Sequence, residues 1–273
     1  MIPLELLAFF AAMGAGLFGS LAGIGGGLII VPLLSVGLGV PLHNAIAVSL
    51  LGVIAVSTTA SANYLNAGFV SRRIGLTLLV STTLGGIIGG FVAGLVDARF
   101  LAALFGIVMI SVALRMLFSG EPAEPQTIDE LGLLEFDATY VEPQTGEEVA
   151  YRVRNFGLGS VISVFAGILS GLLGIGGGVI NVPTMNSLMG VPIRVATTTS
   201  TYMLGATAVA SAVLYFSRGE VAPALAAAVV VGSVIGGQVG ARLHHALPQR
   251  ALTLLFVGVA AFFAFQMLSR VVQ

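Results

Sequence analysis

Long apolar stretches, separated by short polar or basic connections, run through nearly the whole chain. Most are about 20 residues long, the length of a helix that crosses a bilayer. We therefore expect apolar helices over residues 4–22, 28–37, 44–65, 74–96 and 100–118, and again over 156–173, 179–189, 195–216, 222–245 and 249–270.

Two nearly identical glycine runs interrupt this pattern. They are Gly23-Ile24-Gly25-Gly26-Gly27, followed by Pro32, and Gly174-Ile175-Gly176-Gly177-Gly178, followed by Pro183. Because Gly costs about 1 kcal/mol relative to Ala inside a helix, each run is predicted to separate two helices and to expose backbone. A G-x-G-x-x-G pattern is also typical of dinucleotide binding, but no acidic residue follows about 20 residues later and the flanks stay apolar. We therefore reject a nucleotide site.

The composition is that of an integral membrane protein. Of the 273 residues, 57% are hydrophobic and 8% are charged, and the mean hydropathy is +1.05. Soluble domains have about 25% charged residues. The chain has no Cys, so disulfides and thiolate metal sites are excluded, and a net charge of −1 gives no reason to expect a nucleic-acid partner. We expect a multi-pass protein of the plasma or inner membrane, surrounded by the lipid bilayer.

One acidic segment divides the apolar stretches into two groups. Nine of the twelve acidic residues lie from Glu121 to Glu148. We expect an aqueous linker at 119–154 between two membrane regions, 1–118 and 155–273. A small hairpin is suggested by the turn-like residues 143–146 and by the alternating Val149, Tyr151 and Val153.

The two groups repeat one another in a constant register of 151 residues. The register joins these pairs: Gly25 and Gly176, Pro32 and Pro183, Ser49 and Ser200, Tyr64 and Tyr215, Gly86 and Gly237. Such an internal duplication is a common plan of secondary transporters. We expect an all-α polytopic membrane protein of two homologous halves, each with a glycine-broken helix pair and three further transmembrane helices.

The distribution of arginines favours inverted halves. If each broken pair crosses the membrane twice, or enters and returns, each half makes an odd number of crossings. Eight of the eleven arginines then share one side with the linker, against three on the other, whereas a single crossing gives seven against four. The positive-inside rule prefers the first arrangement, which puts the linker in the cytoplasm and both termini outside. Whether the chain has eight or ten membrane segments stays open.

The doubled motifs resemble those of the TauE/SafE sulfite-exporter family. The resemblance rests on Leu-x-Gly-Ile-Gly-Gly-Gly from Leu21, Leu-Gly-Ile-Gly-Gly-Gly from Leu173, and the repeated Gly-Val-Pro at 39–41 and 190–192. It covers nearly the whole membrane part, but not the acidic linker. The resemblance implies transport of small anions, mostly sulfur-containing, such as sulfite, sulfonates and related organic acids.

The glycine breaks are the predicted substrate site. Unpaired N–H groups at the start of the second helix of each pair, together with the helix dipole, favour an anion there. The alternative is that the glycines only permit tight helix packing. The predicted substrate-binding residues are Gly25, Gly26, Gly27, Gly176, Gly177, Gly178, Asn181, Ser49, Thr197, Ser200 and Thr201.

Most polar residues of the predicted site lie in the third apolar stretch of each half, residues 44–65 and 195–216, which are rich in Ser and Thr. We interpret the run Thr197–Thr201 as a polar pathway, although Ser and Thr also bond back to their own helix carbonyls. Asn181 replaces Ile30 of the first half. The glycines of the fourth segments, such as Gly89 and Gly240, are assigned to close helix packing.

The groups that are missing limit the chemistry. No Asp, Glu, Lys or Arg lies in the middle of an apolar stretch, so a buried carboxylate relay has no candidate. His43, His244 and His245 do not have a metal-ligand spacing, and we predict no catalytic residue, metal or cofactor. A transporter of a small anion is therefore the preferred interpretation. An anion channel, an integral-membrane enzyme and a homo-oligomer stay open.

Overall fold

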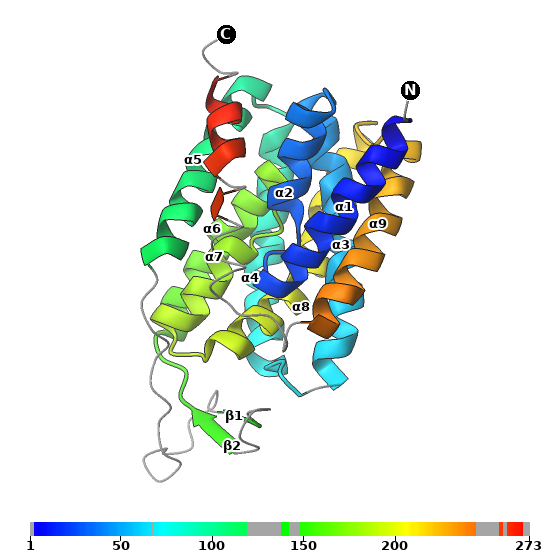
Figure 1. Cartoon of the computed structure of the whole chain (residues 1–273). Coiled ribbons are helices and arrows are strands. Elements are labelled where there is room, and N and C mark those ends of the chain that lie inside the picture. Colours follow the sequence, from blue (N-terminus) through cyan, green and yellow to red (C-terminus); the bar gives the residue numbers. More distant parts are fainter. Residues whose placement is uncertain are drawn as a thin grey trace.

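The protein is an all-α bundle with one small β-hairpin at one end, as Figure 1 shows. The structure is a computed structural model, and it describes residues 3–66, 68–118, 138–141, 148–243, 257–258 and 261–269. Within these residues five helices are long and apolar enough to cross a membrane: α1 (Leu4–Ala22), α3 (Leu42–Asn66), α4 (Arg72–Ala93), α6 (Phe156–Leu173) and α9 (Pro223–Leu243). The multi-helix membrane architecture expected from the apolar pattern is confirmed.

Each glycine run separates a long helix from a short one. The short helices are α2 (Gly27–Pro32) and α7 (Gly178–Pro183), and each continues into a π-helical turn, Leu33–Gly37 or Thr184–Leu188. The second apolar piece of each half was predicted as one helix. It is instead α-helical and then π-helical, with the change directly after Pro32 or Pro183, where the missing proline N–H removes one i→i−4 bond.

The remaining helices are close to their predicted positions. α8 (Ile193–Ser217) is 25 residues long, but its many hydroxyl residues lower its hydropathy and it is not among the five candidate spans. α5 spans Ala98–Phe118. The helix predicted over 74–96 begins earlier, at Arg72, and ends earlier, at Ala93, with Gly94 as its C-cap residue. The stretch predicted over 249–270 lies mostly outside the described residues, with 257–258 and 261–269 helical.

The hairpin expected in the linker is present. β1 (Ala138–Val141) and β2 (Glu148–Tyr151) are antiparallel, with Ala138 opposite Tyr151 and Val141 opposite Glu148. Val153, predicted to continue the alternation, lies beyond the strand. Residues 119–137 and 142–147 of the predicted linker are outside the described part.

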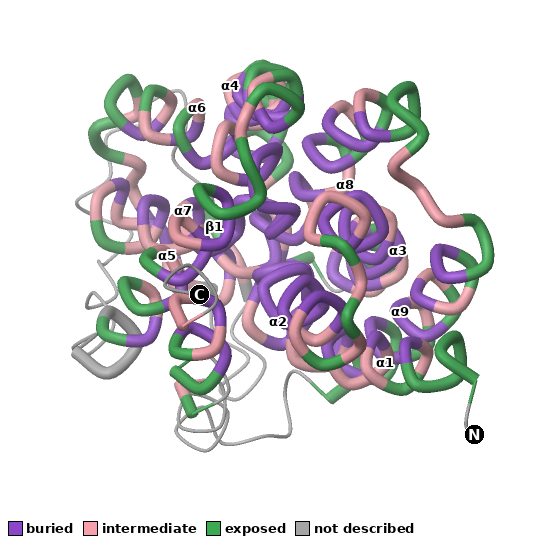
Figure 2. The backbone as a smooth tube through the Cα atoms, turned by 90° about the horizontal axis from the view of Figure 1, so that it is seen from above, coloured by how far each residue is buried: buried purple, intermediate pink, exposed green. Residues whose placement is uncertain are grey.

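The helices pack in layers around a buried centre. α1 packs on α9 and α4 packs on α6, while α3 and α8 contact each other and the neighbouring α9 and α4. Figure 2 shows that buried backbone gathers in α2, α3, α7 and α8, and that exposed stretches lie on the outer helices. The outer face of α4 illustrates the pattern, since Val80, Leu84 and Phe91 are all exposed. Such apolar outer faces suit contact with lipid.

The glycines of α4 and α9 bring these helices into backbone contact with their neighbours. A Cβ atom at Gly85 or Gly89 would meet carbonyl oxygens of α6, and one at Gly236 or Gly240 would meet the backbone of α1. The predicted packing role of these glycines is confirmed. Small residues at such spacing are the usual means of close helix approach in membranes.

The two ends of the bundle carry different connections. The hairpin and the connection from α3 to α4 lie at one end, and Figure 1 shows the start of α1 and the connection from α8 to α9 at the opposite end. The described residues 261–269 also lie at this opposite end.

Candidate functional site

The two glycine loops depend on backbone conformations that other residues rarely adopt. Positive φ angles, between 69° and 80°, occur at six glycines of the loops: Gly23, Gly25, Gly26, Gly174, Gly176 and Gly177. Only glycine adopts this left-handed region without a steric cost. The predicted helix breaks are therefore confirmed. Both loops are buried inside the bundle.

The loops contact each other. A Cβ atom placed on Gly27 would collide with the carbonyl oxygen of Gly174, and one on Gly178 would collide with the carbonyl oxygen of Gly23. Both pairs are related by the same separation of 151 residues. The sequence assigned Gly27 and Gly178 to ligand approach, but this close contact requires glycine at both positions whether or not a ligand binds. Packing alone therefore explains these two glycines in this structure.

Each loop accepts a hydrogen bond from one serine of the opposite half of the chain. Ser49 Oγ on α3 donates to the carbonyl oxygen of Gly174 at 3.0 Å, and also to that of Ile46 at 2.8 Å. Ser200 Oγ on α8 donates to the carbonyl oxygen of Gly23 at 3.1 Å. Both serines have 0% exposure. Two of the predicted site residues are thus brought to the loops.

Several amide groups of the loops have no partner in the described part of the chain. Ile29 and Ile30 donate their N–H groups to Gly26, and Ile180 and Asn181 donate theirs to Gly177. No described acceptor pairs with the amides of residues 27 and 28, or with those of 178 and 179. These N–H groups begin the helical segment Gly27–Gly37 and its counterpart after Gly178. They are the backbone donors that the sequence predicted at the breaks.

The run of five hydroxyls on α8 is occupied by bonds within the protein. Thr197 bonds Ile193, and Thr201 bonds Thr197, both along their own helix. The other three reach different elements: Thr198 donates to Phe69, Thr199 accepts from the N–H of Ser71, and Ser200 reaches Gly23. The run was interpreted as a polar pathway. In this structure a Cβ atom at Gly23 would meet Thr197, so Thr197 packs against the first loop, whereas the hydroxyl of Thr201 bonds along α8. The hydroxyls of the run fix α8 to its surroundings.

Asn181 differs from the rest of the predicted set. It lies on α7, its exposure is 1%, and its Oδ1 atom has no hydrogen-bond partner among the described residues. At the equivalent position of α2 stands Ile30, which is equally buried. An unpaired polar atom in such a place costs about 1–3 kcal/mol.

Two tyrosines, which the sequence marked only as repeated positions, hold the ends of α1 and α6. Tyr64 Oη donates to the carbonyl oxygen of Ser20 at 3.0 Å, and Tyr215 Oη donates to that of Gly171 at 2.9 Å. The two bonds are again 151 residues apart. Their constant spacing in the sequence marks the two tyrosines as equivalent, but it does not reveal their carbonyl partners.

Arg218 provides a further contact that sequence reasoning missed. Its Nη1 donates to the carbonyl oxygen of Gly90 at 2.9 Å, its guanidinium lies 4.5 Å from the centre of the Tyr215 ring, and it pairs with Glu220 at 3.2 Å. These contacts join the end of α8 to the end of α4.

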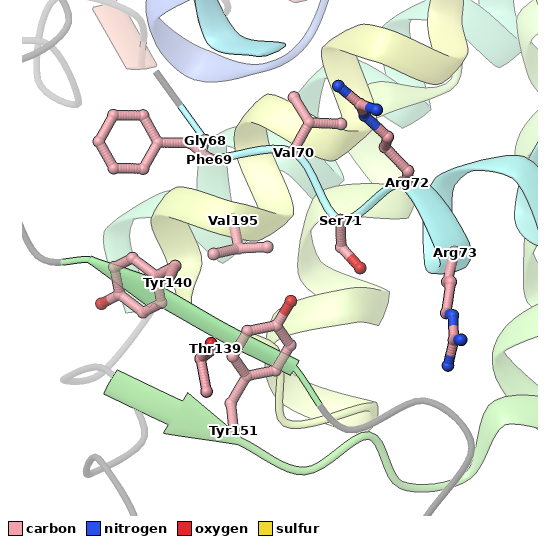
Figure 3. Close-up of a pocket in the computed structure, with 10 residues that line it drawn as sticks. All are labelled: Gly68, Phe69, Val70, Ser71, Arg72, Arg73, Thr139, Tyr140, Tyr151 and Val195. Atoms are coloured by element: carbon pink, nitrogen blue, oxygen red, sulfur yellow. The ribbon is translucent and has the colours of Figure 1, made fainter. Parts of the chain in front are cut away.

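A cavity of about 210 Å³ lies at the hairpin end of the bundle. It is formed by the connection from α3 to α4, the start of α4, the hairpin and α8, and Figure 3 shows its lining residues. Ser71 points toward the hydroxyl of Tyr151, while Arg72 and Arg73 point in opposite directions. Burial raises the pKa of the Tyr151 phenol, and its hydrogen bond with Ser71 partly opposes this shift. The phenol is therefore neutral at ordinary pH.

Among the described residues, His, Cys, Asp and Glu do not gather in groups of three or more. His43 Nε2 lies 3.3 Å from the carbonyl oxygen of Ala93. His244 and His245 lie outside the described residues.

The apolar helices, the paired buried loops and the lipid-suited outer faces together define a multi-pass membrane protein. The chain belongs to the sulfite exporter TauE/SafE family, whose model matches residues 8–267. The resemblance carried by the glycine runs is thereby confirmed, and the protein is a member of a membrane transporter family.

The chain is similar to proteins from bacteria and from an archaeon. The probable membrane transporter protein YunE of Bacillus subtilis is 29% identical, over 88% of this chain and 89% of its own length. MamO of Paramagnetospirillum magneticum, also a probable membrane transporter protein, is 26% identical over 95% of this chain but only 44% of its own length. The probable membrane transporter protein MJ0441 of Methanocaldococcus jannaschii is 24% identical, over 95% and 92%. No solved structure matches the chain.

Proposed function

We propose that the protein carries small anions across the plasma or inner membrane, with sulfite, sulfonates and related organic anions as substrates. The observation that carries this proposal is the meeting of two buried glycine loops that present unpaired backbone N–H groups. Such groups bind oxyanions without a charged side chain, and the helix dipole adds partial positive charge at the same place. The family name supports the choice of sulfur oxyanions.

The substrate would be held by the unpaired amides of residues 27, 28, 178 and 179, with Ser49 and Ser200 as side-chain donors. Because the loops are in contact here, they must separate to admit an anion. Separation breaks the bonds from Ser49 to Gly174 and from Ser200 to Gly23. Each hydroxyl then donates to the anion instead of to a carbonyl, and a hydrogen bond to a charged acceptor is the stronger one.

The membrane regions 1–118 and 155–273 act, in this proposal, as two inverted halves joined by the linker 119–154. Three equivalent pairs of contacts support this, those of Tyr64 and Tyr215, of Ser49 and Ser200, and of Gly27 and Gly178. The α3–α4 and α8–α9 connections, which are also equivalent, lie at opposite ends of the bundle. Inverted repeats allow alternating access, because one repeat can rock against the other around a fixed binding site.

The cavity at the hairpin end suits an approaching anion. Two exposed arginines, Arg72 and Arg73, line it beside the hydroxyl-bearing Ser71 and Thr139. Positive charge around a cavity raises the local concentration of anions and speeds their association. In this proposal the cavity collects substrate from the linker side before it reaches the loops.

Counterflow in liposomes tests the function. Purified protein would be reconstituted into vesicles loaded with unlabelled sulfite, a sulfonate or a carboxylate, and uptake of the labelled anion would be followed. A carrier shows saturable uptake that the loaded anion accelerates. Uptake that does not saturate and is indifferent to the loaded anion would establish a channel instead, and no uptake of any anion would overturn the proposal.

A further inference from the structure

Arg218 makes three kinds of contact at the end of α8. Its Nε and Nη2 atoms donate to the two carboxylate oxygens of Glu220, at 3.2 and 3.3 Å. Its Nη1 donates to the carbonyl oxygen of Gly90, in the last turn of α4, at 2.9 Å. The guanidinium also lies 4.5 Å from the centre of the Tyr215 ring. A single exposed ion pair contributes little to stability, but a carboxylate, a carbonyl and a ring together hold this guanidinium in one place.

The ring beneath Arg218 connects it to the second glycine loop. Tyr215 has 0% exposure. Its Oη donates to the carbonyl oxygen of Gly171, three residues before the loop, at 2.9 Å. α4 and α8 are also in backbone contact here, since a Cβ atom at Gly90 would lie 3.4 Å from Cα of Ser211. The end of α4, the end of α8 and the start of the loop are therefore joined through one arginine and one tyrosine.

The connection from α3 to α4 has the same backbone turn as the connection from α8 to α9. Gly68 and Gly219 are 151 residues apart and have φ angles of 75° and 73°. The N–H of residue 69 bonds the carbonyl oxygen of Tyr64 at 3.2 Å, and the N–H of residue 220 bonds that of Tyr215 at 3.1 Å. The two turns are thus equivalent in conformation.

The ion pair is specific to the second of these turns. The residues 151 positions before Arg218 and Glu220 are Ala67 and Phe69, so the turn does not require charged side chains. Phe69 lines the cavity of about 210 Å³ at the hairpin end (Figure 3). The same turn therefore borders a cavity at one end of the bundle and is bound to α4 by an arginine at the other. Alternating access requires such a difference between the two ends.

We propose that Arg218, through its bonds to Gly90 and Glu220, is the latch of a gate at the end of the bundle that carries the α8–α9 connection. The latch is closed in this structure. When α4 and α8 separate at this end, the guanidinium leaves the carbonyl of Gly90 and a path opens toward Tyr215 and the second loop. This inference rests on the proposed function, because a gate is needed by a protein that exposes its binding site to each side in turn.

Cysteine labelling in lipid nanodiscs tests the latch without any transport, because a water-soluble maleimide reaches both ends of the bundle there. Two reporter substitutions are used in a chain that has no Cys of its own. Ser211→Cys is fully buried against α4, near the latch, and Val70→Cys lines the cavity.

Arg218→Gln, added to each reporter, should raise the labelling rate at position 211 about tenfold or more. The reason is that labelling there requires the open gate, so its rate follows the population of the open state. The rate at position 70 should stay equal or fall, because a transporter that opens at one end closes at the other.

Arg242→Gln is the matched control. Arg242 is an exposed arginine in the last turn of α9, a helix that packs against α1 and α3. Its loss removes the same charge and should leave both labelling rates unchanged. Glu220→Gln breaks the ion pair but keeps the bond from Arg218 to Gly90, so it should raise the rate at position 211 by a smaller factor. If Arg218→Gln fails to fold, Glu220→Gln carries the test.

Two outcomes would overturn the latch. The first is a rate at position 211 that neither Arg218→Gln nor Glu220→Gln changes. The second is an equal rise at positions 211 and 70, which means that the arginine only stabilises the bundle. A faster rate at 211 alone, together with no anion uptake in liposomes, would uphold the movement of α4 and α8 and overturn the proposed anion transport. Anion uptake with an unchanged rate at 211 would do the reverse.

Discussion

Ser200 Oγ lies 3.1 Å from the carbonyl oxygen of Gly23, a residue 177 positions earlier in the chain. The equivalent bond, from Ser49 to Gly174, spans 125 positions. Each serine thus joins a helix of one membrane region to the glycine loop of the other. The two regions are joined at two fully buried serines, and separation of a loop from its serine breaks one of these bonds.

Removal of these hydroxyls tests whether they serve the substrate. Ser49→Ala and Ser200→Ala should each raise the KM for the transported anion by about tenfold to a hundredfold, because a hydrogen bond to a charged group contributes about 1.5–3 kcal/mol. Counterflow in liposomes measures this. Ser57→Ala is the control, since Ser57 also bridges α3 and α8, through Thr201 and Gly205, but does not bond a glycine loop. Equal effects in all three variants would mean that the hydroxyls only hold helices together.

The packing glycines should respond to substitution according to their surroundings. Gly89→Ala places a methyl group against the carbonyl of Ile168 on α6, whereas Gly14→Ala on α1 meets nothing within 4 Å. Overpacking of this kind costs about 1–3 kcal/mol. We therefore expect a lower Tm for Gly89→Ala and an unchanged or higher one for Gly14→Ala, measured by thermal unfolding in detergent. A Tm unaffected by Gly89→Ala would contradict the contact between α4 and α6.

Local sequence patterns were sufficient to predict the helices and their breaks, but not the contacts between helices. Apolar length predicted the helices, and glycine predicted the breaks, because both depend on local chemistry. The partner of each glycine could not be predicted, since Gly27 meets Gly174 only after the bundle assembles. The partners of the hydroxyl run at 197–201 could not be predicted for the same reason. A Ser or Thr hydroxyl can hydrogen-bond either a ligand or a neighbouring helix. The carbonyl oxygens of Phe69 and Gly23 come within reach of the run only in the folded bundle.

The pH dependence of transport should follow the substrate. In the described helices the charged side chains and histidines lie in the first or last turn, as Glu5, His43 and Arg242 do. No titrating group in the middle of these helices can then change charge near neutral pH. Flux of a permanently ionised sulfonate should be nearly flat between about pH 6 and 8, above the reference carboxylate pKa values. A steep profile for that anion in liposomes would reveal a titrating group on the transport path.

The arrangement of the two halves predicts which positions share a side of the membrane. The hairpin and the start of α4 lie at one end of the bundle, and the start of α1 and the end of α8 lie at the other (Figure 1). The chain has no Cys, so single substitutions can be labelled without background. Four exposed positions are suitable for labelling, with the substitutions Glu5→Cys, Arg72→Cys, Thr139→Cys and Ser217→Cys.

With the linker in the cytoplasm, an impermeant thiol reagent added to whole cells should label the cysteines at positions 5 and 217. It should reach those at 72 and 139 only after the membrane is opened. The pair at 72 and 217 is decisive, because these residues flank the equivalent α3–α4 and α8–α9 connections. Parallel halves place both on one side, whereas inverted halves place them on opposite sides. If both cysteines are labelled from outside intact cells, the inverted arrangement is excluded. Alternating access by movement of one inverted half against the other is then excluded as well.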